Sequence, residues 1–312
     1  MNPELYTIHE SSVRLAPFVR RFMHVDTLAD TSVTPAPTGY TYLGSVFNSG
    51  DIYIVDRGCE IRPSTGWHIS GQLRNHDVTV CYRGHVGHLL AEFTPTGFYR
   101  LTGIFGDRAT NKAADVITFS PRLARTLASI RLEPLSTNER LHAIEHCLLE
   151  LIPQARDDDT VVASAGRMLE NSNGLMRIES ISDELGVSER QLCRRFRRIV
   201  GVTPKYFGQV RQINYTVEML LSGDAAALTG LALEAGFYDQ SHFVKAMHRF
   251  FGQGPRRFLN SRHSVLAVFI GASRRFAASG RENQRSRSPH RGAGQARIPQ
   301  WTGFGPGRAP AS

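Results

Sequence analysis

Two short segments of this sequence follow the same pattern, and that repetition constrains the fold more than any other feature. In the first copy an amphipathic stretch, Ile178–Leu185, precedes Gly186, and a basic stretch begins after Ser188. In the second copy Leu228–Ala235 precedes Gly236, which lies 50 positions after Gly186. Glycine adopts a left-handed backbone conformation at little cost, so it suits a tight turn between two helices. Each copy therefore predicts a helix-turn-helix unit.

The second helix of each copy has an apolar stripe at helical spacing and ends at a glycine followed by a proline. The stripes are Leu192, Phe196 and Ile199 in the first copy and Phe243, Met247 and Phe250 in the second. The exits are Gly201–Pro204 and Gly252–Pro255. Between the copies, Pro204–Leu221 predicts one helix of about 27 Å at the usual rise per residue. Such a helix could hold two reading heads roughly 34 Å apart, which is one turn of B-DNA.

The rest of the chain divides into three further parts. Residues 1–135 predict a β-rich domain, because short apolar or alternating runs recur between turn signals. Residues 136–159 predict a connecting helix and linker, which a capping box at Ser136–Glu139 opens. The apolar face of that helix could pack on the front domain or on a second subunit, and the sequence leaves both open. Residues 263–312 predict a disordered basic tail, because few apolar groups are present to repay ordering.

Charge is distributed unevenly along the 312 residues, which carry a net charge of +9. Residues 1–159 hold 15 basic and 18 acidic side chains, residues 160–271 hold 14 and 9, and residues 272–312 hold 8 and 1. A near-neutral front half joined to a basic back half is typical of a chain in which one domain meets a polyanion. Arginine-rich codon usage would give the same balance, so charge alone does not decide the partner.

Residues 160–262 resemble the DNA-binding domain of AraC/XylS-type transcriptional regulators. The segments that carry the resemblance are Ile181–Ser188, Leu192–Phe196, Gly201–Pro204, Ala235–Phe237, Ser241–Phe243 and Gly252–Pro255. The resemblance implies a multidomain α+β chain, with a cupin-like barrel or sandwich as sensor in front of an all-α domain with two helix-turn-helix motifs. The basic tail is not part of the family pattern.

The resemblance also implies which side chains face DNA. Arginine binds guanine O6 and N7 in a bidentate way, glutamine pairs with adenine, and other basic side chains bind phosphates. The predicted base-reading residues are Arg190, Cys193, Arg194, Gln240, Ser241, His242 and Lys245. The predicted phosphate-binding residues are Arg197, Lys205, Arg211, Arg256 and Arg257.

Chemistry in the front domain has little support. Cys81, His85 and His88 have metal-like spacing, but no second Cys–His pair completes a tetrahedral set, so no metal or other cofactor is predicted. No phosphate-binding loop or nucleophile elbow is present, and no enzyme activity is expected. The aromatic candidates for lining a sensor pocket, each of a type that is more often plain core, are Tyr42, Tyr53, Trp67, Phe93 and Phe98.

The sequence thus predicts a transcriptional regulator that reads two adjacent major-groove segments of double-stranded DNA. An activator is the expected role, and the residues leave repression open as well. Its further expected partners are RNA polymerase, a small-molecule effector and a second copy of the chain. No membrane segment or secretory signal is present, so a cytoplasmic, nucleoid-associated protein is expected. The alternatives are a cupin-like metal-dependent enzyme with a helical appendage and a basic protein that coats DNA without sequence preference.

Overall fold

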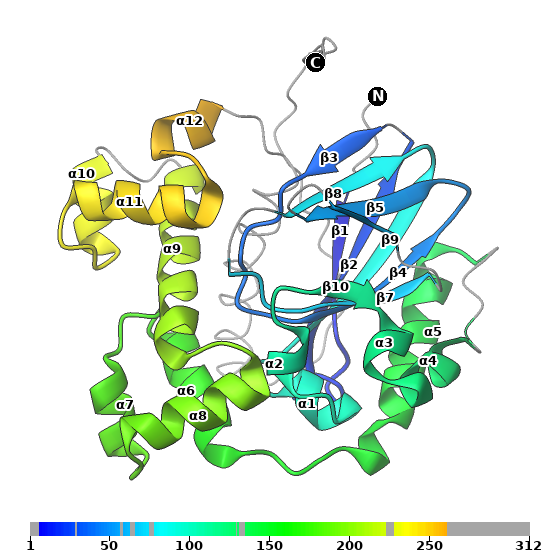
Figure 1. Cartoon of the computed structure of the whole chain (residues 1–312), viewed down its shortest axis with the longest axis horizontal. Coiled ribbons are helices and arrows are strands. Elements are labelled where there is room, and N and C mark those ends of the chain that lie inside the picture. The colour runs from blue at the N-terminus through cyan, green and yellow to red at the C-terminus, as the bar shows by residue number, and fades with distance from the viewer. Residues whose placement is uncertain are drawn as a thin grey trace, which may run out of the picture. The chain divides into compact units, whose positions relative to one another are not determined.

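The computed structural model describes residues 6–28, 30–56, 59–62, 66–74, 78–128, 130, 135–222 and 228–260. These residues belong to one compact unit, in which a β-rich front lobe precedes a helical lobe (Figure 1). The strands are β1 (Tyr6–Glu10), β2 (Val19–Thr27), β3 (Thr31–Val33), β4 (Tyr42–Phe47), β5 (Asp51–Asp56), β6 (Cys59–Ile61), β7 (Trp67–Ser70), β8 (Val78–Arg83), β9 (Val86–Phe93) and β10 (Ala113–Asp115). The helices of the front lobe and its connection are α1 (Gly97–Thr102), α2 (Gly106–Ala109), α3 (Val116–Phe119), α4 (Pro121–Ala128) and α5 (Thr137–Glu150), with a 3₁₀ turn at Ile152–Gln154. The helices of the helical lobe are α6 (Thr160–Asn171), α7 (Ile178–Glu184), α8 (Glu189–Val200), α9 (Pro204–Ser222), α10 (Leu228–Glu234), α11 (Gln240–Phe251) and α12 (Pro255–Asn260).

The front lobe is built from two antiparallel sheets. One sheet has the strand order β1-β2-β9-β4-β7-β10, and the other has the order β3-β8-β5-β6. Val25 and Val86 of the first sheet share a buried cluster with Ile52 and Tyr82 of the second, so the two sheets face each other across an apolar layer. The predicted β-rich domain is confirmed as a two-sheet arrangement.

The opposite face of the six-stranded sheet is covered by α1 to α5. Alternate residues of β9, among them Leu89, Ala91 and Phe93, pack there against α4 and α5. The predicted capping box is present, because the Ser136 hydroxyl accepts from the Glu139 amide and the Glu139 carboxylate accepts from the Ser136 amide. The apolar residues of α5 lie in this same cluster, so the connecting helix packs on the front lobe.

The helical lobe is held together by residues at the predicted helical spacing. The aromatic side chains of Phe196, Phe207, Phe237, Phe243 and Phe250 are at most 4% exposed. Removing one buried phenylalanine from such a core costs about 3–5 kcal/mol. The stripes read from the sequence are therefore the core of this lobe.

The two lobes share one apolar cluster. Met23, Tyr42 and Leu90 of the front lobe belong to the same buried cluster as Phe207 and Val210 of α9. Hydrogen bonds cross at the same place, because the Asn214 amide donates to the Pro37 carbonyl (3.2 Å) and the Tyr206 hydroxyl donates to the Leu73 carbonyl (3.0 Å). Helix α9 therefore contacts the front lobe along its first half.

Over the described ranges, no helix is both long enough and apolar enough to cross a membrane. The predicted tail, residues 263–312, lies outside the described residues.

Candidate nucleic-acid interface

The first helix-turn-helix unit is formed by α7 and α8. Gly186 joins them with φ +63°, the left-handed conformation that the sequence predicts. Ser188 caps α8, because its hydroxyl accepts from the Gln191 amide and the Gln191 side chain accepts from the Ser188 amide. One face of α8 is buried, and the opposite face carries arginines that solvent reaches.

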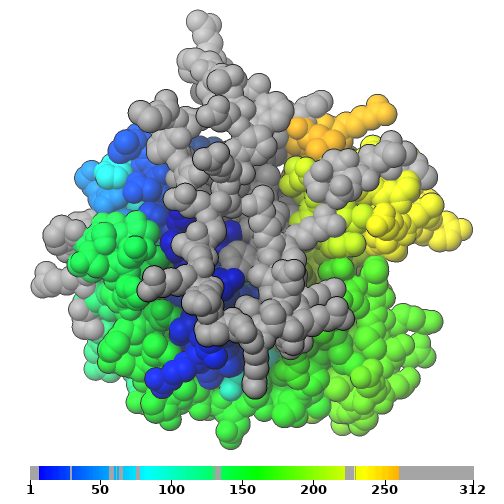
Figure 2. Space-filling view, turned by 180° about the vertical axis from the view of Figure 1, so that it is seen from behind, coloured from blue at the N-terminus to red at the C-terminus, as the bar shows by residue number. Residues whose placement is uncertain are grey.

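The second unit, formed by α10 and α11, repeats this construction with one residue more in its turn. Gly236 has φ +78°, and Asp239 caps α11 by accepting from the His242 amide. Two residues separate Gly186 from α8, whereas three separate Gly236 from α11. The two copies are therefore offset by 50 positions at the glycine and by 51 along the second helix. The additional position places Tyr238 in solvent, with 87% of its surface exposed. Both units reach the surface of the helical lobe, the first yellow-green and the second yellow (Figure 2).

Helix α9 joins the two units, and both units pack against its side. The Gln212 side chain donates to the Ala235 carbonyl (3.0 Å), and the Tyr206 ring lies 5.7 Å from the Phe250 ring. The second unit therefore packs along the first half of α9, where Phe207 also contacts the first unit. Both units therefore pack against α9, and the expectation that this helix holds them about one turn of B-DNA apart stays a prediction.

The predicted base-reading residues lie on two helices and differ in their surroundings. Arg190 and Arg194 are exposed on α8, and Gln240, Ser241, His242 and Lys245 are exposed on α11. Cys193 is half-buried, and burial raises the pKa of its thiol. The His242 ring stands edge-on to Phe237 at 5.2 Å, so it also braces the turn.

The predicted phosphate-binding residues do not form one set. Lys205 and Arg256 each follow the proline that begins a helix, α9 and α12, and both are exposed, as are Arg257 and Arg197. Arg211 is different, because its guanidinium lies 5.7 Å from the centre of the Tyr40 ring in the front lobe. The structure therefore separates Arg211 from the exposed basic residues.

The front lobe contacts the end of α8. An added Cβ at Gly106 of α2 would lie 2.5 Å from the Ile199 carbonyl oxygen, so only glycine fits there without displacement. The Thr110 hydroxyl donates to the Gly201 carbonyl (2.7 Å). Asp107 lines a hollow together with four residues of α8 and one that precedes α9: Cys193, Arg194, Arg197, Arg198 and Thr203. A carboxylate of the front lobe therefore stands beside the first reading helix.

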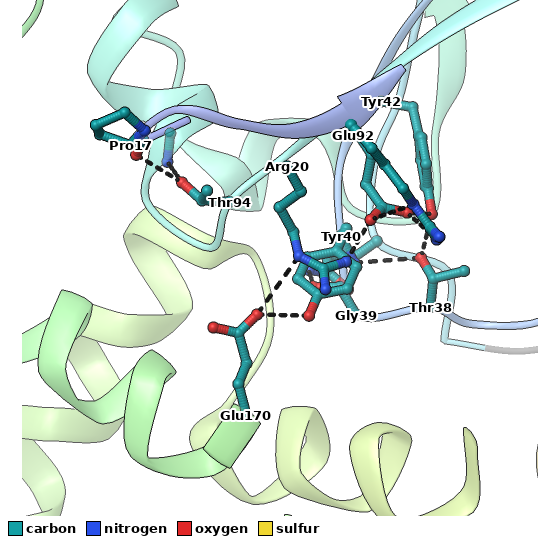
Figure 3. Close-up of polar contacts among 12 residues, drawn as sticks. Pro17, Arg20, Thr38, Gly39, Tyr40, Tyr42, Glu92, Thr94 and Glu170 are labelled. Carbon is teal, nitrogen blue, oxygen red and sulfur yellow. Dashed lines mark hydrogen bonds and ion pairs between the residues drawn. The ribbon is translucent and has the colours of Figure 1, made fainter. Parts of the chain in front are cut away.

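A buried polar cluster lies where the lobes meet (Figure 3). Glu92 is completely buried and accepts from Arg21 (3.1 and 3.0 Å), from the Tyr42 hydroxyl (2.8 Å) and from Arg20. Burial by itself raises the pKa of Glu92, but the charges of Arg21 and Arg20 outweigh it and lower that pKa to about 2. In the same cluster, the Tyr40 hydroxyl donates to Glu170 of α6 (2.5 Å). The cluster thus joins the sheet to the first helix of the helical lobe.

The residues with metal-like spacing are not brought together. Cys81 lies on β8 of the four-stranded sheet and His88 on β9 of the six-stranded sheet, and His85 is exposed and pairs with Asp26 (3.1 Å). His88 is buried, and its Nε2 lies 3.3 Å from Nε2 of His68, a partner that sequence spacing did not indicate. Among the residues the structure describes, no group of three histidine, cysteine or acidic side chains is placed to hold a metal ion.

The aromatic candidates for a sensor pocket are buried in different places. Trp67, Phe93 and Phe98 belong to the cluster beneath α1 to α5. Tyr42 belongs to the cluster that the lobes share, and Tyr53 lies beside the guanidinium groups of Arg62 and Arg83. These five side chains therefore do not surround one space.

Comparison with known proteins identifies similarity to one segment in the second half of this chain. Residues 181–261 match a protein family described as "Helix-turn-helix domain". The transcriptional activator RhaS of Shigella boydii is 30% identical over 89 residues, which are 28% of this chain and 31% of RhaS. The transcriptional regulator ExsA of Pseudomonas aeruginosa is 32% identical over 81 residues, which are 26% of this chain and 29% of ExsA. The match thus spans about three tenths of the length of these relatives.

Among solved structures, ToxT from Vibrio cholerae aligns with a TM-score of 0.41 and 12% identity. The alignment covers 83% of this chain and 98% of that one.

Proposed function

We propose, from the premise that residues 181–261 are a helix-turn-helix domain of the AraC/XylS type, that this chain is a sequence-specific DNA-binding transcriptional regulator. The observation that carries the proposal is the pair of capped helices, α8 and α11. Each helix buries one face in the lobe and exposes polar or basic side chains on the other. A helix of this kind fits the major groove, where every base pair presents its own pattern of donors and acceptors.

Two classes of contact follow from this proposal. The base-reading set is Arg190, Cys193, Arg194, Gln240, Ser241, His242 and Lys245. The phosphate set is Arg197, Lys205, Arg256 and Arg257. Arg211, which the sequence also assigned to phosphate, is half-buried and lies 5.7 Å from the centre of the Tyr40 ring, and its phosphate contact stays a prediction.

The front lobe is proposed to change the affinity or the assembly of the helical lobe rather than to perform catalysis. Support comes from the contacts of α2 with α8 and of Tyr40 with Glu170, through which a change in the sheets reaches the DNA-binding helices. RNA polymerase, a small-molecule effector and a second copy of the chain are proposed as further partners. A cytoplasmic location on the nucleoid is proposed with them, and so is the role of activator.

The first experiment is selection of bound duplexes from a random library by the full-length chain near physiological salt. Recovery of one motif with two conserved segments is the expected result, and its spacing reports how the two helices are set. If the chain binds duplexes but no sequence is enriched, the result would favour the alternative of a basic protein that coats DNA, because charge alone gives affinity without sequence preference.

The second experiment separates base contacts from phosphate contacts. Arg194→Ala should weaken binding to the selected duplex by about 1–3 kcal/mol and leave binding to random duplex much less affected. Lys205→Ala should weaken both duplexes about equally and lower the salt slope by about one. Equal losses on both duplexes for Arg194→Ala would contradict the base-reading assignment.

A further inference from the structure

The two reading helices can be compared position by position because both are capped. Ser188 and Asp239 are the capping residues, so each position of α8 corresponds to the position of α11 that lies 51 residues later. The outward positions then pair as follows: Arg190 with Ser241, Cys193 with Val244, Arg194 with Lys245, and Arg197 with His248. The two reading surfaces therefore differ at three of these four pairs, whereas Arg194 and Lys245 are both basic.

The surface of α8 is dominated by guanidinium groups. Arg190, Arg194 and Arg197 are exposed, whereas two other arginines of this helix are engaged within the protein. Arg195 makes a two-point contact with Asp159 (2.8 and 2.6 Å), and Arg198 lies over the Phe105 ring at 4.0 Å. A bidentate arginine matches N7 and O6 of guanine, which is the commonest specific contact in the major groove.

The surface of α11 has a different character. No arginine occupies its outward positions, since Arg249 contacts Gln209 and the Tyr206 ring. Instead, Val244 takes the place of Cys193, and Tyr238 is the additional residue of the longer turn, 87% exposed where the helix begins. Apolar groups contact the C5-methyl of thymine, and glutamine, here Gln240, pairs with adenine.

We propose that the two units read DNA segments of different base composition: α8 reads guanines through its arginines, and α11 together with Tyr238 reads mainly A·T pairs through their thymine methyl groups, with Lys245 as its one exposed lysine contact. The inference rests on the proposed function and specifies the base composition of each segment of its DNA site. Tyr238 is the specificity-determining residue that it adds to the predicted set.

The test replaces single atoms of the duplex that the full-length chain selects. In one series each guanine becomes 7-deazaguanine, which lacks the N7 acceptor, and in the other each thymine becomes uracil, which lacks the methyl group. Loss of N7 should weaken binding about tenfold in one segment, and loss of a contacted methyl should weaken it about threefold to fourfold in the other.

Variants assign the segments to the helices. In Arg194→Ala the 7-deazaguanine effect should disappear while the uracil effect remains, and in Tyr238→Ala the reverse should hold. Tyr238→Phe keeps the ring and should keep the uracil effect, which separates contact by the ring from contact by the hydroxyl. Arg125→Ala is the matched control, because Arg125 is exposed on α4 of the front lobe, outside both helix-turn-helix units.

Three outcomes would overturn the inference while the proposed function stands. They are a 7-deazaguanine effect of equal size in both segments, no uracil effect in either, and a uracil effect that survives Tyr238→Ala. Failure to select any motif would instead refute the proposed function itself, so the two failures are distinguishable.

Discussion

Replacing Glu92 with glutamine tests how strongly the buried polar cluster stabilises the fold. The carboxylate is completely buried against Arg20, Arg21 and the Tyr42 hydroxyl. Its pKa of about 2, against 4.5 for an ordinary glutamate, corresponds to about 3 kcal/mol at neutral pH. Breaking a buried ion pair by removing one partner costs about 3–5 kcal/mol, in agreement with that figure. We therefore expect Glu92→Gln to lower the free energy of unfolding by about 3 kcal/mol at pH 7.

The dependence of this loss on pH identifies its cause. The folded-state pKa is depressed, so the stabilisation is complete above the unfolded-state pKa near 4.5 and is lost as the pH falls towards 2. Urea unfolding followed by circular dichroism measures the free energy of unfolding at pH 7 and at pH 3.5. The difference in this free energy between wild type and Glu92→Gln should be about 1 kcal/mol smaller at pH 3.5 than at pH 7.

The exposed carboxylate of Glu179, paired with Arg177 at 3.1 Å, provides the control. Glu179→Gln should change the free energy of unfolding by less than about 1 kcal/mol at either pH. The electrostatic reasoning would be refuted if Glu92→Gln lowered the free energy of unfolding by less than about 1 kcal/mol at pH 7. An equal loss at pH 7 and pH 3.5 would refute it too.

Three further changes follow from the structure. Burial lowers the pKa of His68 from 6.5 to about 4, so the unfolded state binds a proton more readily than the folded state. The free energy of unfolding should therefore fall by up to about 3 kcal/mol as the pH drops between those values. In urea titrations the free energy of unfolding should depend less steeply on pH for His68→Asn than for wild type, and an identical pH dependence would contradict this. Gly106→Ala should lower the free energy of unfolding by about 1–3 kcal/mol in thermal unfolding, because the new Cβ meets the backbone of α8. Gly230→Ala should be neutral or stabilising, because a Cβ there meets nothing within 4 Å. Equal effects of the two variants would argue against the α2–α8 contact. Ser188→Ala should cost about 1 kcal/mol by removing the capping box of α8, measured from the urea midpoint at constant slope, and no change in that midpoint would show that the cap is not needed.

The parts of the fold that local chemistry determines could be predicted from the sequence. Helices α7 to α11 follow from apolar spacing, and their turns follow from Gly186 and Gly236. The longer strands β2, β4, β5, β8 and β9 follow from alternating runs. Strands such as β1, β3 and β10 did not, because three to five residues at a sheet edge carry little periodicity.

The contacts between distant segments could not be predicted. Nothing in the sequence singles out Arg20 and Arg21 as partners of a buried carboxylate, since charged side chains are seldom buried unless paired. Their partner, Glu92, lies some 70 positions further along the chain, and only the pairing of β2 with β9 brings them together. The position of Arg211 near Tyr40 could not be predicted for the same reason, because Tyr40 belongs to the other lobe. The division of α8 into a buried and an exposed face, in contrast, depends on one helix and could be predicted.

The apolar cluster that the lobes share bears on how this chain can be divided. Phe207 and Val210 of α9 are completely buried, in part against Met23 and Leu90 of the sheets. A fragment that began near residue 160 would present those side chains to water and would be prone to self-association. A protease cut between Ile152 and Asp159, by comparison, would leave two pieces that stay bound through the shared cluster and purify together.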